Sequence, residues 1–358
     1  MLFGSAKELA PPMPGEWGAR CPATHPQRGP IVSRTVLVTG GAGYIGSHVS
    51  KALAEVGDVP VCYDSLEKGH EWAVRFGPFE QGDIGDAARL DEVFSCYRPS
   101  AVLHLAGYIE VGESMRKPER YLHNNVTSSH TLIDAAVRHG VDAFVFSSTC
   151  AVYGLPQTEL LAETHPIAPI SPYAVSKMLV EQALATAARR GLRSVSLRYF
   201  NATGADPGGD IGEAHRPETH LLPLAADAAL GLGPALTVLG HDYPTFDGSC
   251  IRDFVHVSDL ADAHLRALAW LDRRGPDGHH EVFNLGSGIG NSVFQVLAET
   301  ARIAGHALPH SIGPRREGDP PMLVGDIAKA QREIGWVPRQ GLSTQIEDTL
   351  RWRRMMSR

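Results

Sequence analysis

Tyr173 and Lys177, which are four residues apart, are the side chains in this sequence best suited to proton transfer. Ser171 and Pro172 precede them as a helix N-cap and a first helical residue, so both should lie on one face of the first turns of a helix. An ammonium group beside a phenol favours the phenolate and lowers the pKa of the tyrosine. The pair therefore predicts a general base or acid that works near neutral pH.

A hydroxyl side chain is expected to assist this pair. Thr149 closes the segment Ser147–Thr149, which follows an apolar run, and open α/β sheets bind their ligands at the carboxyl ends of strands. From there Thr149 can orient a substrate hydroxyl toward Tyr173. A YxxxK spacing also occurs on many exposed helices, and a threonine after a strand is often only a cap, so the interpretation depends on a cofactor site elsewhere in the chain.

Such a site is indicated by the glycine-rich segment at residues 40–46, which follows a short apolar run and opens a helical stretch. Gly40 permits a tight turn, Gly43 lets the backbone approach a pyrophosphate, and Gly46 lets helix and strand pack closely. Asp64, 18 residues after Gly46, would accept hydrogen bonds from the adenosine ribose and repel a 2′-phosphate, which favours NAD over NADP. The acidic turn at Asp83 and Ile84 suits the adenine edge.

The elements that must position these residues alternate regularly. Apolar, β-branched runs predict strands at 35–39, 59–64, 101–106, 142–147 and 194–200, and helices are expected at 48–56, 87–97, 128–139 and 172–190. This order predicts an α/β protein with a Rossmann-type doubly wound parallel sheet. After Asn201 the pattern loosens, and the tail from Glu281 suggests a smaller C-terminal α/β substrate-binding domain.

Composition excludes several classes of protein. The chain has 358 residues and a formal charge of −7, whereas a nucleic-acid-binding protein has a basic footprint. No apolar run is long enough to span a membrane. Five scattered cysteines without a CxxC pair suggest reduced thiols in the cytoplasm. Six prolines and the lack of apolar periodicity in residues 1–33 predict a flexible N-terminal extension.

Longer motifs identify a family. The segments GGAGYIGSH, HLAG, VGES, SSTCAVYG, SPYAVSK, LRYFNATGA, DYPTFDGSCIRDFVHVSDLADAH and NLGSGIGNSV resemble the UDP-galactose 4-epimerases of the extended short-chain dehydrogenase/reductase family. The resemblance runs from about Arg34 to the C-terminus. It implies an NAD-dependent isomerase (EC 5.1.3.2) that interconverts UDP-glucose and UDP-galactose through a 4-keto intermediate, in galactose and exopolysaccharide precursor metabolism.

The resemblance also implies roles for individual residues. Tyr173, Lys177 and Thr149 match the catalytic group. Positions matching the NAD site, which also includes Tyr173 and Lys177, are Gly40, Gly43, Tyr44, Ile45, Gly46, Asp64, Asp83, Ile84, Leu105, Ala106, Gly107, Asn124 and Phe200. Besides Thr149 and Tyr173, the positions matching the UDP-sugar site are Asn201, His220, Thr237, Val238, Leu239, Arg252, Arg316, Asp319 and Leu323. Ile109 stands where the family often has a lysine, so one cofactor contact differs.

By this resemblance, residues 34–200 form the NAD-binding domain, with 255–282 packing back on it, and residues 201–254 and 283–358 form the UDP-sugar-binding domain. A UDP-hexose substrate and a homodimer are expected, with no metal, nucleic acid or membrane partner.

Related dehydratases and decarboxylases need a carboxylate directly after the strand-end threonine, where this chain has Cys150 and Ala151. A UDP-pentose or UDP-N-acetylhexosamine 4-epimerase and a catalytically dead NAD-binding regulator remain as alternatives.

Overall fold

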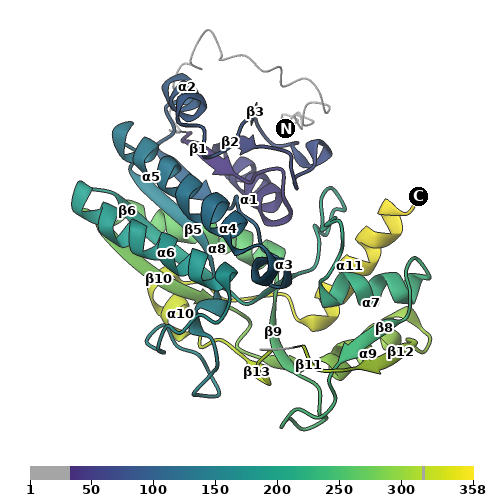
Figure 1. Ribbon diagram of the computed structural model, residues 1–358. Coiled ribbons are helices and arrows are strands. Elements are labelled where there is room, and N and C mark those ends of the chain that lie inside the picture. Colours follow the sequence, from purple (N-terminus) through teal and green to yellow (C-terminus); the bar gives the residue numbers. More distant parts are fainter. Residues whose placement is uncertain (1–32, 317–318) are drawn as a thin grey trace, which may run out of the picture.

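A seven-stranded parallel sheet forms the larger part of the computed structural model, which describes residues 33–316 and 319–358 (Figure 1). The strand order is β10-β6-β5-β4-β1-β2-β3, and the order reverses between β1 and β4. The strands are β1 (Thr35–Thr39), β2 (Val59–Asp64), β3 (Phe79–Gln81), β4 (Ala101–His104), β5 (Ala143–Thr149), β6 (Arg193–Tyr199) and β10 (His279–Leu285). The predicted doubly wound fold is confirmed.

Helices cover both faces because successive side chains of each buried strand point to opposite sides. Val36 and Val38 join a core cluster on one face, whereas Leu37 between them joins the cluster on the other. The first face carries α1 (Tyr44–Glu55), α8 (Val257–Asp272) and α10 (Ala328–Ile334). The second face carries α2 (Ala87–Tyr97), α5 (Ser128–Arg138) and α6 (Pro172–Ala187).

Short helical segments complete the connections of this layer. Helix α1 begins at Tyr44, directly after the glycine turn and four residues before the expected start at His48. The remaining segments are η1 (Glu71–Ala73), α3 (Val111–Arg116), α4 (Pro118–Tyr121), the π-helical η2 (Leu122–Thr127), η3 (Cys150–Tyr153) and η4 (Ala188–Arg190).

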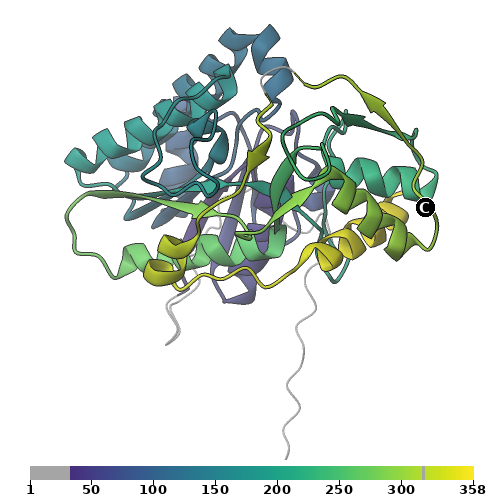
Figure 2. The same cartoon turned by 90° about the horizontal axis from the view of Figure 1, so that it is seen from below.

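The smaller part of the structure lies beside the large sheet (Figure 2). In its main sheet β9 (Ile251–His256) pairs with β7 (Asn201–Thr203), β11 (Gly290–Ser292) and β13 (Met322–Leu323). A separate ribbon joins β8 (Leu236–Leu239) to β12 (His310–Gly313). Helices α7 (Leu221–Leu230), α9 (Val293–Ala304) and α11 (Leu342–Met356) share an apolar core with these strands.

The chain passes more than once between the two parts. Residues 257–285 lie with the large sheet, since α8 packs against α1 and β10 pairs with β6. Helix α10 also packs there, because Ile327, Ile334 and the fully buried Trp336 belong to the core of the first face. The expected sugar-binding region 283–358 therefore contains segments that pack in the larger part. The expected extension at 1–33 lies, except for Ser33, outside the described residues.

Two expectations from composition concern cysteines and membrane helices. Cys62, Cys150 and Cys250 are buried free thiols. Cys96 is disulfide-bonded, so the expectation of reduced thiols is wrong for this residue, whose pairing the sequence spacing does not reveal. Within residues 33–316 and 319–358, no helix combines the length and apolar character needed to cross a membrane.

Candidate active site

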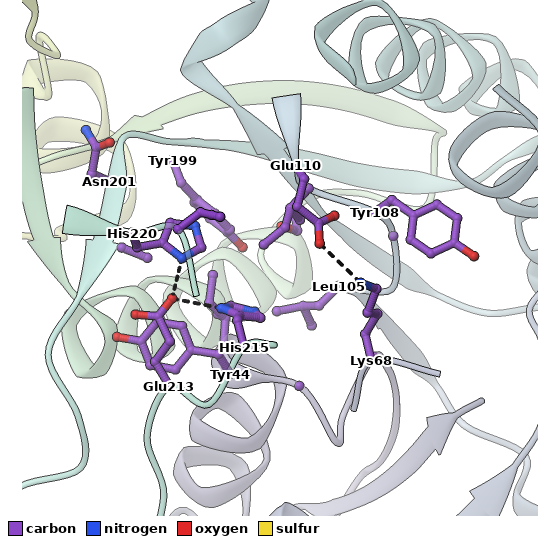
Figure 3. Close-up of a pocket in the computed structure, with 18 of the residues that line it drawn as sticks. Tyr44, Lys68, Leu105, Tyr108, Glu110, Tyr199, Asn201, Glu213, His215 and His220 are labelled. Atoms are coloured by element: carbon purple, nitrogen blue, oxygen red, sulfur yellow. Dashed lines mark hydrogen bonds and ion pairs between the residues drawn. The ribbon is translucent and has the colours of Figure 1, made fainter. Parts of the chain in front are cut away.

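A cavity of about 520 Å³ lies where the carboxyl ends of the parallel strands meet the smaller part of the structure. Its walls combine the glycine turn, the starts of α1 and α6, and segments of the 201–252 region (Figure 3). Every residue that the sequence assigns to catalysis, cofactor or substrate lines this cavity, except Leu323. The structure thus brings together positions that lie up to 279 residues apart, from Gly40 to Asp319.

The glycine turn has the shape of an anion cradle. Gly40 has φ of +71°, and a Cβ there would lie 2.6 Å from the backbone nitrogen of Ala106. At Gly46, a Cβ would lie 2.1 Å from the carbonyl oxygen of Gly40. Helix α1 begins here without a side-chain cap and without an acidic residue in its first turn. Its first amide groups are therefore suited to a pyrophosphate, which a helix N-terminus attracts.

Asp64 is held in place by backbone amides at the end of β2. Its Oδ2 accepts a hydrogen bond from Ala42 N at 3.1 Å, and its Oδ1 accepts one from Leu66 N at 2.9 Å. Burial raises the pKa of the carboxyl group, and these two hydrogen bonds oppose the shift. Asp83 is positioned similarly, since its Oδ1 accepts from Gly85 N at 2.7 Å. Both acidic residues line the cavity, and Asp64 has the place after the second strand that a dinucleotide site on this fold uses to bind the ribose.

Tyr173 and Lys177 lie in the first two turns of α6, as expected. Ser171 caps the helix by accepting a hydrogen bond from Ala174 N at 3.2 Å, and Pro172 follows. The Lys177 ammonium donates to Ser147 O at 2.8 Å and lies 4.8 Å from the centre of the Phe146 ring. Burial lowers the pKa of Lys177 to about 8.

The electrostatics of the pair differ from the sequence-based expectation. Burial raises the pKa of Tyr173 to about 12, and a hydrogen bond with the Thr149 hydroxyl opposes this only in part. The prediction that the pKa of Tyr173 is lowered is therefore wrong. The physical reason is that desolvation of the phenolate in the cavity outweighs the hydrogen bond with Thr149, which is the contact that favours the charged form.

Thr149 ends β5 and accepts a hydrogen bond from Ala151 N at 3.2 Å. Its neighbour Cys150 is a buried thiol, and burial raises its pKa to about 12. The position that would need a carboxylate for elimination or decarboxylation thus holds a protonated thiol. Tyr173, Lys177 and the Thr149 hydroxyl line the cavity beside this thiol.

The expected substrate residues lie on the opposite wall. Arg252 on β9 forms an ion pair with Asp319, with 2.5 Å between Nη2 and Oδ1, and Arg316 is exposed at the cavity. Leu323 pairs with Arg252 in the β13–β9 register but does not line the cavity. Its side chain packs against the apolar cluster of Cys150, Val152, Tyr153, Leu161 and Phe200.

One group in the wall was missed by the sequence analysis. Glu213, His215 and Glu218 surround His220 on the loop before α7. Figure 3 shows Glu213, His215 and His220 together in the cavity. Burial opposes protonation of His220, but the charges of Glu213 and Glu218 outweigh it and raise its pKa to about 10. The signal in the sequence is the spacing E-x-H-x-x-E-x-H, which no familiar helical metal motif matches.

Hydrogen bonds tie this wall to the cofactor side of the cavity. Tyr44 of α1 donates from its hydroxyl to Gly204 O at 2.7 Å. His70 Nε2 lies 2.8 Å from Ala214 O, and Lys51 Nζ lies 2.7 Å from Asp206 Oδ1. Residues 204–214, which we call the tied segment, are also bonded through Asp210, whose carboxylate lies 3.1 Å from Lys51 Nζ and whose carbonyl oxygen accepts from Arg75 at 3.1 Å.

Ile109, which takes the place of the lysine often found in the family, also lines the cavity and is partly exposed. The cation on this side is Lys68, whose Nζ lies 3.3 Å from Glu110 Oε1 (Figure 3). Lys68 lines the same cavity, so a positive charge is present near this position even though it comes from another segment.

Comparison with known proteins agrees with this fold and site. Residues 36–286 match the model of the NAD dependent epimerase/dehydratase family. The UDP-glucose 4-epimerase of Rhizobium leguminosarum bv. trifolii is 50% identical over 323 residues, covering 90% of this chain and 98% of the relative. The chain belongs to the NAD dependent epimerase/dehydratase family, so its cofactor is NAD.

Solved structures of members of this family have the same fold as this chain. The UDP-glucose 4-epimerase of Brucella ovis in complex with NAD superposes with a TM-score of 0.86 at 44% identity, covering 89% of this chain and 98% of that one. The UDP-glucose 4-epimerase of Bifidobacterium longum in complex with NAD+ and UDP superposes with a TM-score of 0.84 at 34% identity, covering 90% and 98%.

Proposed function

We propose that this protein is a UDP-glucose 4-epimerase, which interconverts UDP-glucose and UDP-galactose through a 4-keto sugar. One observation carries the proposal: Thr149, Tyr173 and Lys177 share a single cavity with the glycine turn, and a thiol follows Thr149 where elimination would need a carboxylate. The high identity to proteins of that name supports the same conclusion.

NAD, held by the glycine turn and Asp64, supplies reversible hydride acceptance at the sugar C4. The chain's own residues handle the proton. Tyr173 takes the proton from the 4-hydroxyl and later returns it, while Thr149 orients that hydroxyl through its own hydrogen bond. Lys177 is buried beside this group and contributes a positive charge that favours the phenolate. Because the hydride is returned in every cycle, no second redox substrate is required.

The nucleotide must stay anchored while the sugar turns over between the two hydride transfers. Arg252 and Arg316 are the arginines of the cavity, and the planar guanidinium suits a diphosphate. In our proposal Asp319 leaves Arg252 for the uridine ribose. The remaining nucleotide and sugar contacts would come from Asn201, His220, Thr237, Val238 and Leu239.

A panel of UDP-sugars tests this proposal. Purified protein is incubated with UDP-galactose, and UDP-glucose formation is measured with a coupled dehydrogenase; denatured protein is analysed for released NAD. UDP-pentoses and UDP-N-acetylhexosamines are assayed in parallel, because they represent the same chemistry on another sugar. Absence of turnover on every sugar, with NAD still bound, would instead support the dead regulator.

We also propose a homodimer located in the cytoplasm. Apolar side chains exposed on α3 and η2, among them Val111, Met115 and Leu122, offer a surface that a second copy could cover. Light scattering of the purified protein measures the mass of the assembly, and cell fractionation locates it.

A further inference from the structure

The loop between the tied segment and α7 places four potential metal ligands around one point. Glu213 Oε1 lies 2.9 Å from His215 Nδ1 and 2.8 Å from His220 Nδ1. Glu218 Oε1 lies 2.9 Å from the same nitrogen of His220. One ligand atom from each of the four residues lies within 4.8 Å of the other three.

Two imidazoles and two carboxylates are a ligand set that suits a divalent transition metal. A tetrahedral ion with ligands at about 2.0–2.1 Å separates those ligands by about 3.3 Å. The three nitrogen–oxygen pairs that now lie 2.8–2.9 Å apart would need to separate by about 0.5 Å, and any pair near the 4.8 Å limit would need to move closer. All four side chains come from one eight-residue loop, so the adjustment involves a single segment.

The carboxylates of the cluster take their positive charge from His220, and a metal ion would replace the proton of that imidazole and supply the charge in its place. The Glu213 side chain is 5% exposed and the Glu218 side chain 8% exposed, so both carboxylates are buried. Within the described part of the chain, the ion pairs of these two carboxylates are made by histidines. Arg353 is nearby, but its guanidinium is paired with Asp227 at 2.5 Å. Buried carboxylates are stable when they are paired or bind a metal.

Glu218 provides a second, independent observation. Its Oε1 accepts backbone hydrogen bonds from Thr219 N at 2.8 Å and His220 N at 2.9 Å, which fix the carboxylate. Its Oε2 is buried and has no hydrogen-bond partner among the described residues. A buried carboxylate oxygen without a donor is costly, and a metal ion would satisfy it.

The backbone of the loop is held in place on both sides of the cluster. Trp352 Nε1 donates to Glu213 O at 2.8 Å, and His70 Nε2 lies 2.8 Å from Ala214 O. Fixed ligands lose little freedom when an ion binds, which favours binding.

We propose that Glu213, His215, Glu218 and His220 form a binding site for one divalent transition-metal ion, with Zn²⁺ as the best match to the ligand set. Glu213, His215 and His220 line the cavity, so the ion would form part of its wall, and the nucleotide contact assigned to His220 in the proposed function would then be made beside the bound ion. This inference goes beyond the proposed epimerase reaction, whose steps use Tyr173, Thr149 and Lys177 and require no metal. It replaces the expectation from sequence that the chain has no metal site.

The test is metal binding by the full chain. Protein treated with a chelator and then freed of it is titrated with Co²⁺ while the visible d–d absorption is recorded, and Zn²⁺ is then added to displace the Co²⁺. We expect one ion per chain and the spectrum of a four-coordinate site with nitrogen and oxygen ligands. Absence of Co²⁺ and Zn²⁺ binding would overturn the proposal.

Matched variants locate the ion. His215→Ala and Glu218→Gln should weaken Co²⁺ binding at least as much as the roughly 10- to 100-fold that losing a hydrogen-bonded partner of a ligand costs. His306→Ala removes an exposed histidine outside the cluster and should bind like the parent protein. Thermal melting and NAD content show which variants fold, and the isosteric Glu218→Gln serves if His215→Ala does not. Equal affinity in the parent and a folded cluster variant would place the ion elsewhere and refute the site.

Failure of this proposal and failure of the proposed function are distinguishable, because Co²⁺ binding is measured without turnover. A protein that epimerises UDP-galactose but binds no metal refutes the metal site alone. A protein that binds Co²⁺ at the cluster but has no epimerase activity refutes the proposed function alone.

Discussion

Replacing Tyr173 by phenylalanine removes one oxygen atom from the cavity and should abolish most of the turnover. The lost hydroxyl has Thr149 as its hydrogen-bond partner, and Thr149 keeps its bond from Ala151 N. We therefore expect a stability loss of about 0.5–1.5 kcal/mol, the usual net contribution of one hydrogen bond. Turnover should fall by at least about a hundredfold, equivalent to roughly 2.7 kcal/mol of transition-state stabilisation.

The pKa of Tyr173 makes this prediction sharper. At a pKa of about 12 the phenolate fraction at pH 8 is only about 10⁻⁴, and lowering the pKa to 8 requires about 5 kcal/mol in favour of the phenolate. We expect this stabilisation from bound oxidised NAD together with Lys177. Turnover should rise with pH until it passes the lowered pKa, since the phenolate is the active form.

Two assays check the reasoning. A coupled assay of UDP-galactose conversion measures turnover, and the 295 nm absorbance of tyrosinate is titrated with and without NAD, using Tyr173→Phe as the reference for the other tyrosines. UDP affinity should be unchanged in the variant, because the expected uridine contacts lie on the opposite wall. Near-normal turnover in Tyr173→Phe would falsify the mechanism, and identical titrations of the two proteins with NAD bound would refute the pKa argument.

Four further outcomes are expected. Asp64→Ala should lower the NAD content of purified protein, measured after denaturation, because the ribose hydroxyls lose their acceptor; full retention would contradict the assignment. Removal of residues 1–30 should leave the melting temperature and activity unchanged, and aggregation would show that the extension packs on the core. Leu323 lies behind the cavity wall and packs against the cluster that contains Phe200, a residue of that wall, so Leu323→Gly should raise N-acetylhexosamine activity and Leu323→Tyr should suppress it, within the roughly 10–200-fold that a few buried carbons confer; an unchanged substrate ratio would show that Leu323 does not influence the sugar. Lowering the pH from 7 to 5 should destabilise the protein by about 2 kcal/mol for each of His104 and His264. Burial lowers the pKa of His104 to about 3 and that of His264 to about 4, so only the unfolded chain takes up these protons. Urea unfolding at the two pH values measures the free energy of unfolding, and equal stability would contradict the prediction.

Five strands of the large sheet, β1, β2, β4, β5 and β6, were predictable because each is almost wholly buried and rich in apolar or β-branched residues. The edge strand β10 (His279–Leu285) was not predicted, because it begins with two histidines and a glutamate that are only partly buried. β3 (Phe79–Gln81) was not predicted either, since three residues are too few for a periodic pattern. The short strands β7, β11 and β13 are likewise held together by their pairing with β9, which links residues far apart in sequence. Local patterns cannot reveal such pairings.

The features of the site likewise divide into those that local sequence patterns predict and those that only the folded structure reveals. Gly40, Asp64, Tyr173 and Lys177 were found from sequence because each belongs to a motif next to a predictable strand or helix. The raised pKa of Tyr173 could not be predicted, since it depends on how deeply the folded chain encloses the hydroxyl. The Glu213–His220 cluster was missed for a related reason: its ligands lie on an irregular loop, where spacing in sequence does not translate into a known geometry.

The bonds that fix the tied segment also bear on how long a cofactor stays in place. Tyr44, Lys51, His70 and Arg75 bond to this segment, and opening that side means breaking these contacts together. A catalyst that restores its own oxidant in every cycle has no need to exchange it. We therefore expect the half-life of the protein–NAD complex to exceed the turnover time by orders of magnitude, so that cellular NAD levels influence activity at assembly of the holoenzyme and not during catalysis.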